Sequence, residues 1–264
     1  MTGRTSGVAF SLILLSASCD EKKSEPDKAT AKATASAVLP TAPPPASEAP
    51  PDDEAPKKKE PKVCKPGTVV DFDGNAALEA QVRLKTSKDK GDVSVADLAK
   101  VKSINLSQGK VDELDPCIFP HFKNLKDLFL GPGKLDDLSP IADLKNIESL
   151  RASLNRVTDL KPLANLTKMD RLDLGHTRVM DISPLAGLTE LSDLQLDDTP
   201  VSDLKPLAEC KKLERLSIQR TNVKDLAPLV GLEKLKFLYT SGAPIQDKFA
   251  LAPLVTKGLK VISE

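Results

Sequence analysis

RLDLGHTRVMDISPLAGLTEL, residues 171–191, spaces its aliphatic side chains in a way that decides the fold. Leu172 and Leu174 stand two residues apart, as on one face of a strand, and the next aliphatic residue is Val179. Neither a helix nor a plain strand has this spacing. The stretch LSDLQLDDTPVSDLKPLAECKKL, residues 191–213, repeats the pattern 22 residues later. A fixed period of this size is typical of a stacked repeat array, in which neighbouring units bury one continuous core.

Seven units with this pattern follow one another. The first interval is 24 residues and the later ones are 22, with the consensus L-x-x-L-x-L-x-x-T-x-V-x-D-L-x-P-L-A-x-L. Positions 4 and 6 alternate as in a short strand. Ser139 and Ser183, each followed by Pro, resemble N-caps and predict a single helical or 3₁₀ turn on the return path. The units start at Val101, Leu125, Ile147, Met169, Leu191, Leu213 and Leu235.

The motifs LDLGHTRVMDISPLAGL, LQLDDTPVSDLKPLAEC and LSIQRTNVKDLAPLVGL resemble leucine-rich repeats of the 22-residue internalin-like class. The resemblance covers about residues 101–250. It implies an α/β solenoid with a parallel β-sheet on the concave face, short 3₁₀ or helical turns on the convex face and a helical N-terminal cap. The sequence departs from the class at the ladder position that often holds Asn, where Thr would bond the neighbouring turn more weakly. That position holds Gly109, Gly133, Asn155, Thr177, Thr199, Thr221 and Ala243.

Both ends of the array need protection, because the end of a solenoid exposes its core. Residues 69–107 resemble the helical cap of such arrays: Leu78 and Val82 share one helical face, and Asp92 or Ser94 would cap a second short helix. We expect a cap over 64–100 and a repeat array over 101–264, closed by a strand within GLKVISE (258–264).

The N-terminal residues predict export and a membrane anchor. VAFSLILLSA (8–17) is too short to span a bilayer and is typical of a secretory signal. It ends in LLSASC, which resembles the lipobox of bacterial lipoproteins, in which the Cys is acylated. We therefore expect residues 1–19 to be a signal peptide with Cys19 lipidated; the alternative is an ordinary signal peptide with an incidental Cys. The segment 20–63 has almost nothing to bury and predicts a disordered Pro/Ala/Lys/Glu linker.

The net charge and the cysteines give further information about possible partners and about the structure. The 264-residue chain has a net charge of zero, which gives no global field for nucleic acid. Cys64 and Cys117 can pair outside the cytoplasm, although two unlinked thiols are the alternative. Cys210 occupies a core column otherwise filled by Leu, so we expect it to be a small buried apolar residue.

Neither catalysis nor a cofactor is indicated. His121 and His176 lie in different units and have no Cys or acidic cluster at metal spacing. A recurring Asp occupies one position of the repeat, where we expect it to accept hydrogen bonds from the turn backbone. Its occurrences are Asp137, Asp159, Asp181, Asp203 and Asp225. We therefore expect neither an enzyme nor a metal protein.

Function should lie on the side chains that the core does not use. Positions 3, 5, 7 and 8 are expected to point to the concave face, and aromatic and Arg side chains are the usual anchors of interfaces. Neighbouring opposite charges on this face could simply satisfy one another, and the C-terminal segment could cover the last two aromatic residues. The predicted partner-binding residues are Phe129, Arg151, Arg171, Arg215, Phe237 and Tyr239.

Taken together, these patterns predict a monomeric, membrane-anchored protein of the bacterial cell envelope, periplasmic or at the surface. It would bind a protein or peptide on the concave face, without catalysis. The alternative is a structural envelope protein that holds cell-wall or glycan material.

Overall fold

The computed structural model describes residues 62–64, 67–247 and 249–263. The predicted signal peptide, Cys19 and the linker up to residue 61 lie outside these residues. Within the described ranges, no helix is both long enough and apolar enough to cross a membrane.

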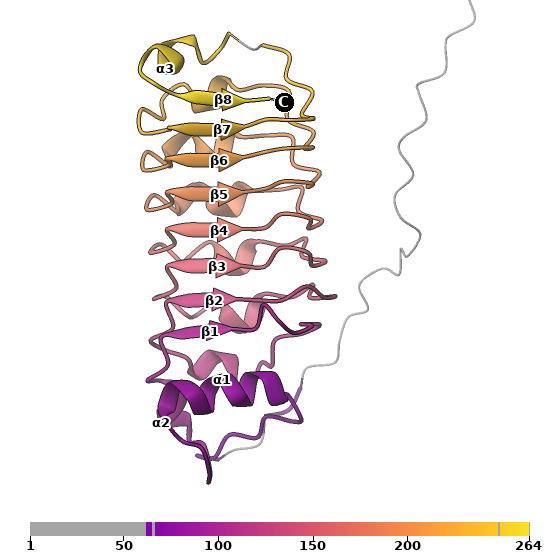
Figure 1. Ribbon diagram of the computed structural model, residues 1–264, viewed down its shortest axis with the longest axis vertical. Coiled ribbons are helices and arrows are strands. Elements are labelled where there is room, and N and C mark those ends of the chain that lie inside the picture. The colour runs from indigo at the N-terminus through magenta and orange to yellow at the C-terminus, as the bar shows by residue number, and fades with distance from the viewer. Residues whose placement is uncertain (1–61, 65–66, 248, 264) are drawn as a thin grey trace, which may run out of the picture. The chain divides into compact units, whose positions relative to one another are not determined.

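Eight parallel strands form one sheet in chain order, as Figure 1 shows. Each strand has three residues, and its middle residue continues the column of position 4 from one unit to the next. The strands are β1 (Ser103–Asn105), β2 (Asp127–Phe129), β3 (Ser149–Arg151), β4 (Arg171–Asp173), β5 (Asp193–Gln195), β6 (Arg215–Ser217), β7 (Phe237–Tyr239) and β8 (Lys260–Ile262). The seven predicted units and the closing strand are thereby confirmed.

One short helix brings the chain back in each unit. Ser139 does not cap its 3₁₀ helix: Leu138 holds the cap position without a side-chain bond, and Ser139 is the first helical residue. The reason is Asp137, whose Oδ1 accepts the Ser139 N–H at 2.7 Å and Oδ2 the hydroxyl at 2.8 Å. The 3₁₀ helices are η1 (Phe119–His121), η2 (Ser139–Ile141), η3 (Lys161–Leu163), η4 (Ser183–Gly187), η5 (Lys205–Glu209) and η6 (Ala227–Leu229).

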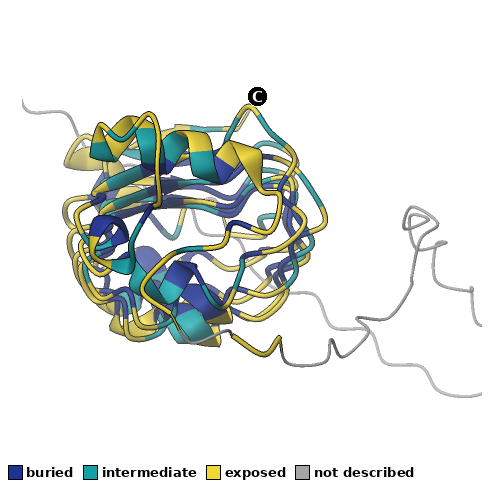
Figure 2. Ribbon diagram, turned by 90° about the horizontal axis from the view of Figure 1, so that it is seen from below, coloured by how far each residue is buried: buried dark blue, intermediate teal, exposed yellow. Residues whose placement is uncertain are grey.

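The aliphatic columns form a single core that runs through the stack (Figure 2). Leu194 and Leu196 are completely buried, as the repeat register predicts. Cys210 is buried in its Leu column, and loss of solvation raises the pKa of its thiol to about 11. Burial of one such aliphatic side chain contributes about 1.5–3 kcal/mol, so the stack as a whole is stable where an isolated unit would not be.

At the ladder position, the prediction that Thr bonds the neighbouring turn is wrong. Thr177 donates its hydroxyl to Leu174 O at 2.7 Å, within its own unit. Asn155 reaches the preceding unit, since its Nδ2 donates to Gly131 O at 3.0 Å and its Oδ1 accepts from Leu135 N at 3.2 Å. A threonine hydroxyl is too short for this reach, so it closes its own turn.

Helices protect both ends of the stack. α1 (Ala76–Thr86) packs against β1 and buries Leu78 and Val82, while α2 (Val95–Leu98) packs against α1 and η1. Ser94, and not Asp92, caps α2: its side chain accepts the N–H of Asp97 in a reciprocal capping box. At the other end, α3 (Ala252–Thr256) and β8 complete the last unit.

Candidate binding face

The outward side chains of the strands form two columns on one face of the sheet. The register of the strand pairs aligns them from β1 to β8. Column 3 contains Ser103, Asp127, Ser149, Arg171, Asp193, Arg215, Phe237 and Lys260. Column 5 contains Asn105, Phe129, Arg151, Asp173, Gln195, Ser217, Tyr239 and Ile262. All six predicted partner-binding residues therefore lie in these two columns.

Two of the three predicted arginines form ion pairs across neighbouring strands. Arg151 Nε lies 2.9 Å from Asp173 Oδ2, and Arg215 Nη1 lies 3.2 Å from Asp193 Oδ2. Arg171 lies 3.8 Å from Asp170, its neighbour in the chain. Within the described part of the chain, the buried Oδ1 of Asp193 accepts no hydrogen bond. Exposed pairs of this kind add about 0–1 kcal/mol to stability, so they shape the surface more than they hold the fold.

The two charges of each pair lie at different depths. The Arg151 side chain is 55% exposed and that of Asp173 only 16%; the values for Arg215 and Asp193 are 49% and 19%. The carboxylates therefore sit close to the sheet, and the guanidinium groups form the outer layer. An approaching molecule meets N–H donors first.

An aromatic pair lies at the C-terminal end of the face. Phe237 is flanked by two cations: the guanidinium carbon of Arg215 is 5.8 Å and Lys260 Nζ 5.6 Å from the ring centroid. β8 runs beside β7 with Ile262 opposite Tyr239, and both aromatic residues remain partly exposed. The C-terminal segment thus flanks the two rings. Phe129, also partly exposed, lies on β2 toward the other end.

A third column lies just beyond the strands, at position 8, and from the third unit on its backbone is left-handed. The values of φ are 61° at Leu154, 56° at His176, 54° at Asp198 and 51° at Arg220. Each of these N–H groups donates to a carbonyl of the following unit, as from Leu154 to Gly175 O at 2.9 Å. The turn needs this conformation to continue the backbone ladder past the strand. Gly242 continues the column with a φ of 74°.

Polar side chains in this column bind one another. Arg220 Nε donates to Asp198 Oδ1 at 2.6 Å, and His176 Nε2 lies 3.3 Å from Asp198 Oδ2. The Arg220 hydrogen bond lowers the pKa of the Asp198 carboxyl, opposed by partial burial and assisted by the nearby His176. Leu154 is the exception, an apolar side chain that is 53% exposed. Leu154 was not predicted as a site residue; its signal in the sequence is an aliphatic residue where the later units have His, Asp, Arg and Gly.

Comparison with known proteins supports the architecture. No protein-family model matches the sequence, and no curated protein does. An internalin (inlF) of Listeria monocytogenes matches 71% of this chain and 55% of its own, with 29% identity and a TM-score of 0.65. Internalin C2 of the same organism matches 72% of this chain and 93% of its own, with 28% identity and a TM-score of 0.60. The chain has the leucine-rich-repeat fold, in an arrangement similar to that of these internalins.

The repeat protein spans about half the length of the inlF chain. A leucine-rich-repeat protein of Leptospira interrogans shares the fold at 20% identity and a TM-score of 0.51, over 63% of this chain and 50% of its own.

The recurring aspartates of this repeat protein bind backbone, as predicted. Each accepts the N–H two residues further on, at 2.7 to 2.9 Å. Their carboxylates thus fix the entry to each 3₁₀ helix, which accounts for their recurrence at one position of the repeat. Among the described residues, no group of three or more His, Cys, Asp or Glu could hold a metal ion.

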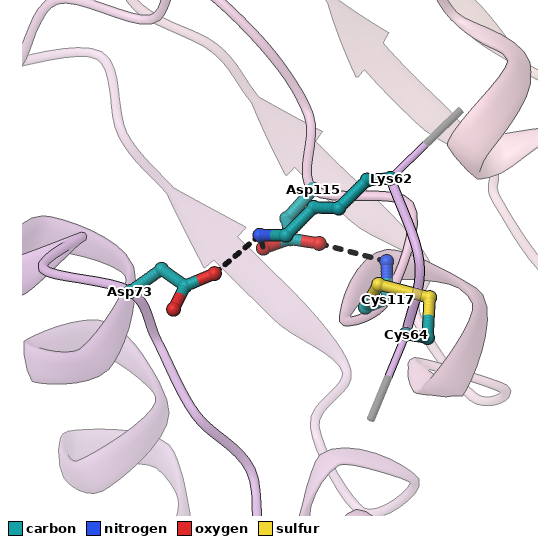
Figure 3. The surroundings of a disulfide bond; sticks show 5 residues. All are labelled: Lys62, Cys64, Asp73, Asp115 and Cys117. Atoms are coloured by element: carbon teal, nitrogen blue, oxygen red, sulfur yellow. Dashed lines mark hydrogen bonds and ion pairs between the residues drawn. A yellow bond between two sulfur atoms is a disulfide. The ribbon is translucent and has the colours of Figure 1, made fainter. Parts of the chain in front are cut away.

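A disulfide lies away from the sheet face, at the cap (Figure 3). Cys64 and Cys117 are bonded with their Cα atoms 5.3 Å apart. Beside them Lys62 pairs with Asp115 at 2.8 Å and also with Asp73, and these two hydrogen bonds raise the pKa of the Lys62 ammonium. Asp115 Oδ1 also accepts the Cys117 N–H at 2.7 Å. These contacts attach the chain entering the cap to the first repeat.

Proposed function

We propose that this leucine-rich-repeat protein is a lipid-anchored, extracytoplasmic protein of the bacterial cell envelope that binds a protein or peptide on its concave face without catalysing a reaction. The observation that carries the proposal is the pair Phe237 and Tyr239, two partly exposed aromatic side chains on one strand of the sheet.

Their setting favours recognition. A side chain fixed on a strand loses little further freedom when it binds, which lowers the entropic cost of association. Arg215 and Lys260 flank Phe237 and supply charges that could orient a partner. Aromatic and Arg anchors of this kind carry much of the binding energy in known interfaces.

The anchoring part of the proposal rests on sequence. The apolar run before Cys19 and the polar linker after it fit a lipoprotein signal followed by a spacer. The internalin-like matches come from a bacterium and are consistent with a secreted or surface location. We propose the domain order signal peptide (1–19), linker (20–63), cap (64–100) and repeat array (101–264), in a monomer.

Site-specific photo-cross-linking tests the binding face. A photoreactive phenylalanine analogue replaces Tyr239 in one version of the full chain and Val230, an exposed residue at the end of η6, in the control. Irradiation of intact envelopes should yield a discrete protein adduct from position 239 and none from 230. The same adducts from both positions would contradict a concave-face partner. Retention on isolated wall material, with no protein adduct, would favour the structural envelope alternative.

A further inference from the structure

We infer that the partner presents an acidic peptide segment, with one aliphatic or aromatic side chain among its carboxylates, to a surface centred on Leu154. This inference rests on the proposed function, because it specifies what the concave face recognises. The Leu154 surface consists of Arg151, Leu154, Arg156, His176 and Arg178, at positions 5, 8 and 10 of two adjacent units.

The conformation of Leu154 is the first argument. A left-handed backbone costs free energy for every residue with a Cβ, and more for Leu than for Asn or Gly. The ladder imposes that conformation, because Leu154 N–H donates to Gly175 O and Leu154 O accepts from Gly133 N at 3.1 Å. Burial does not offset the cost, since the residue is 53% exposed. Strained residues of this kind concentrate at ligand-binding sites.

Charge is the second argument, and it selects the ligand. Arg151 donates through Nε to Asp173 Oδ2, and its side chain is 55% exposed, so its terminal N–H groups are not used in this bond. Position 10 carries Arg156 and Arg178 in these two units. Planar guanidinium groups suit carboxylates, which they can bind in a bidentate manner.

A peptide fits this surface better than a polyanion does. Carboxylates such as Asp173 lie directly beneath the guanidinium layer, and a chain of closely spaced phosphates would meet them as well. Leu154 offers an apolar contact that a nucleic acid backbone or an acidic polysaccharide does not use. A protein segment can place its carboxylates beside the arginines and an apolar side chain on Leu154.

Selection from a phage-displayed library of random 12-residue peptides tests the inference on the full chain. We expect the selected peptides to be enriched in Asp and Glu around an apolar residue. Their affinity, measured by fluorescence polarisation with synthetic copies, should fall at least tenfold for Leu154→Asn and for Arg151→Gln. Val230→Asn, the same type of change on the convex side, should leave the affinity unchanged. The thermal midpoint of Leu154→Asn should equal or exceed that of the wild type, because Asn accepts the left-handed conformation more readily.

The outcomes separate this inference from the proposed function. Selected peptides that need Tyr239 but are not acidic, and that tolerate Leu154→Asn, would overturn the inference and leave concave-face binding intact. An oligoglutamate peptide that binds as tightly as the selected ones would show that the surface recognises charge alone. That result would also overturn the inference. Selected peptides that are insensitive to every change on the concave face would overturn both.

Discussion

Lys88, just after α1, holds the carboxylate of Asp97 at the start of α2: its Nζ lies 2.6 Å from Oδ2, and the Asp97 side chain is nearly buried. The same carboxylate accepts the N–H and the hydroxyl of Ser94 and pairs with Lys100 at 3.0 Å. These bonds, that of Lys88 foremost, place the pKa of Asp97 far below its usual value. The two helices of the cap are thus joined through one charged group.

This group should make the cap sensitive to acid. A carboxyl whose pKa is lower in the folded state contributes stability at neutral pH, and that contribution is lost as the pH falls below the ordinary Asp value of about 4. We expect Asp97→Asn to lower the thermal midpoint at pH 7. The difference from the wild type should shrink progressively below about pH 4. A difference that stays constant from pH 7 to pH 2 would exclude this role for the charge.

The register of the repeat can be tested with two adjacent residues. Leu194 is completely buried, whereas Gln195 is partly exposed on the sheet face. Leu194→Ala should lower the free energy of unfolding by about 2–5 kcal/mol, through lost burial and a cavity. Gln195→Ala should change it by less than about 0.5 kcal/mol. Chemical denaturation measures both, and similar losses would contradict the assigned register.

The disulfide should stabilise the cap. Replacing both Cys64 and Cys117 with Ala opens a loop of 53 residues, which should cost about 2–4 kcal/mol of unfolding free energy. Cys210→Ala serves as the control that removes a thiol without opening a loop. Non-reducing peptide mapping of exported protein should recover the Cys64 and Cys117 peptides linked. Complete alkylation of both thiols without reductant would show that they are not bonded in the cell.

The membrane anchor has its own test. Cys19→Ser should move the protein from the membrane fraction to the soluble fraction, because it removes the acyl chains that hold it. Mass spectrometry of the wild type should show an acyl modification on Cys19. Continued sedimentation of the variant, together with an unmodified wild-type cysteine, would leave an ordinary signal peptide as the explanation.

Partner binding should depend on the aromatic end of the face. Tyr239→Ala should weaken binding of the cross-linked partner by more than about 1 kcal/mol, and Asp193→Ala should weaken it less. Tyr239 is partly exposed on the sheet face and lies outside the buried core, so its removal should leave the thermal midpoint almost unchanged. A large loss of stability would mean that the ring serves to close the stack at β8.

The sequence predicts the architecture because hydrophobic spacing reports burial directly. The same register places Phe237 and Tyr239 on the sheet face and brings Arg151 beside Asp173. The left-handed backbone of Leu154 could not be predicted in this way. It results from a backbone hydrogen bond between units, which the pattern of polar and apolar residues does not indicate. The contact between Arg171 and Asp170 likewise depends on the direction of a flexible side chain, which the spacing of residues does not predict.

The bond between Cys64 and Cys117 also determines how the molecule bears a mechanical load. A force applied to the N-terminal segment reaches the fold at Cys64. It is transmitted through the disulfide to Cys117, close to η1. The covalent path bypasses the residues between them, which include α1, α2 and β1. Tension between an anchored N-terminus and a partner held on the sheet would therefore be carried by the later repeats, while the cap stays out of the line of force.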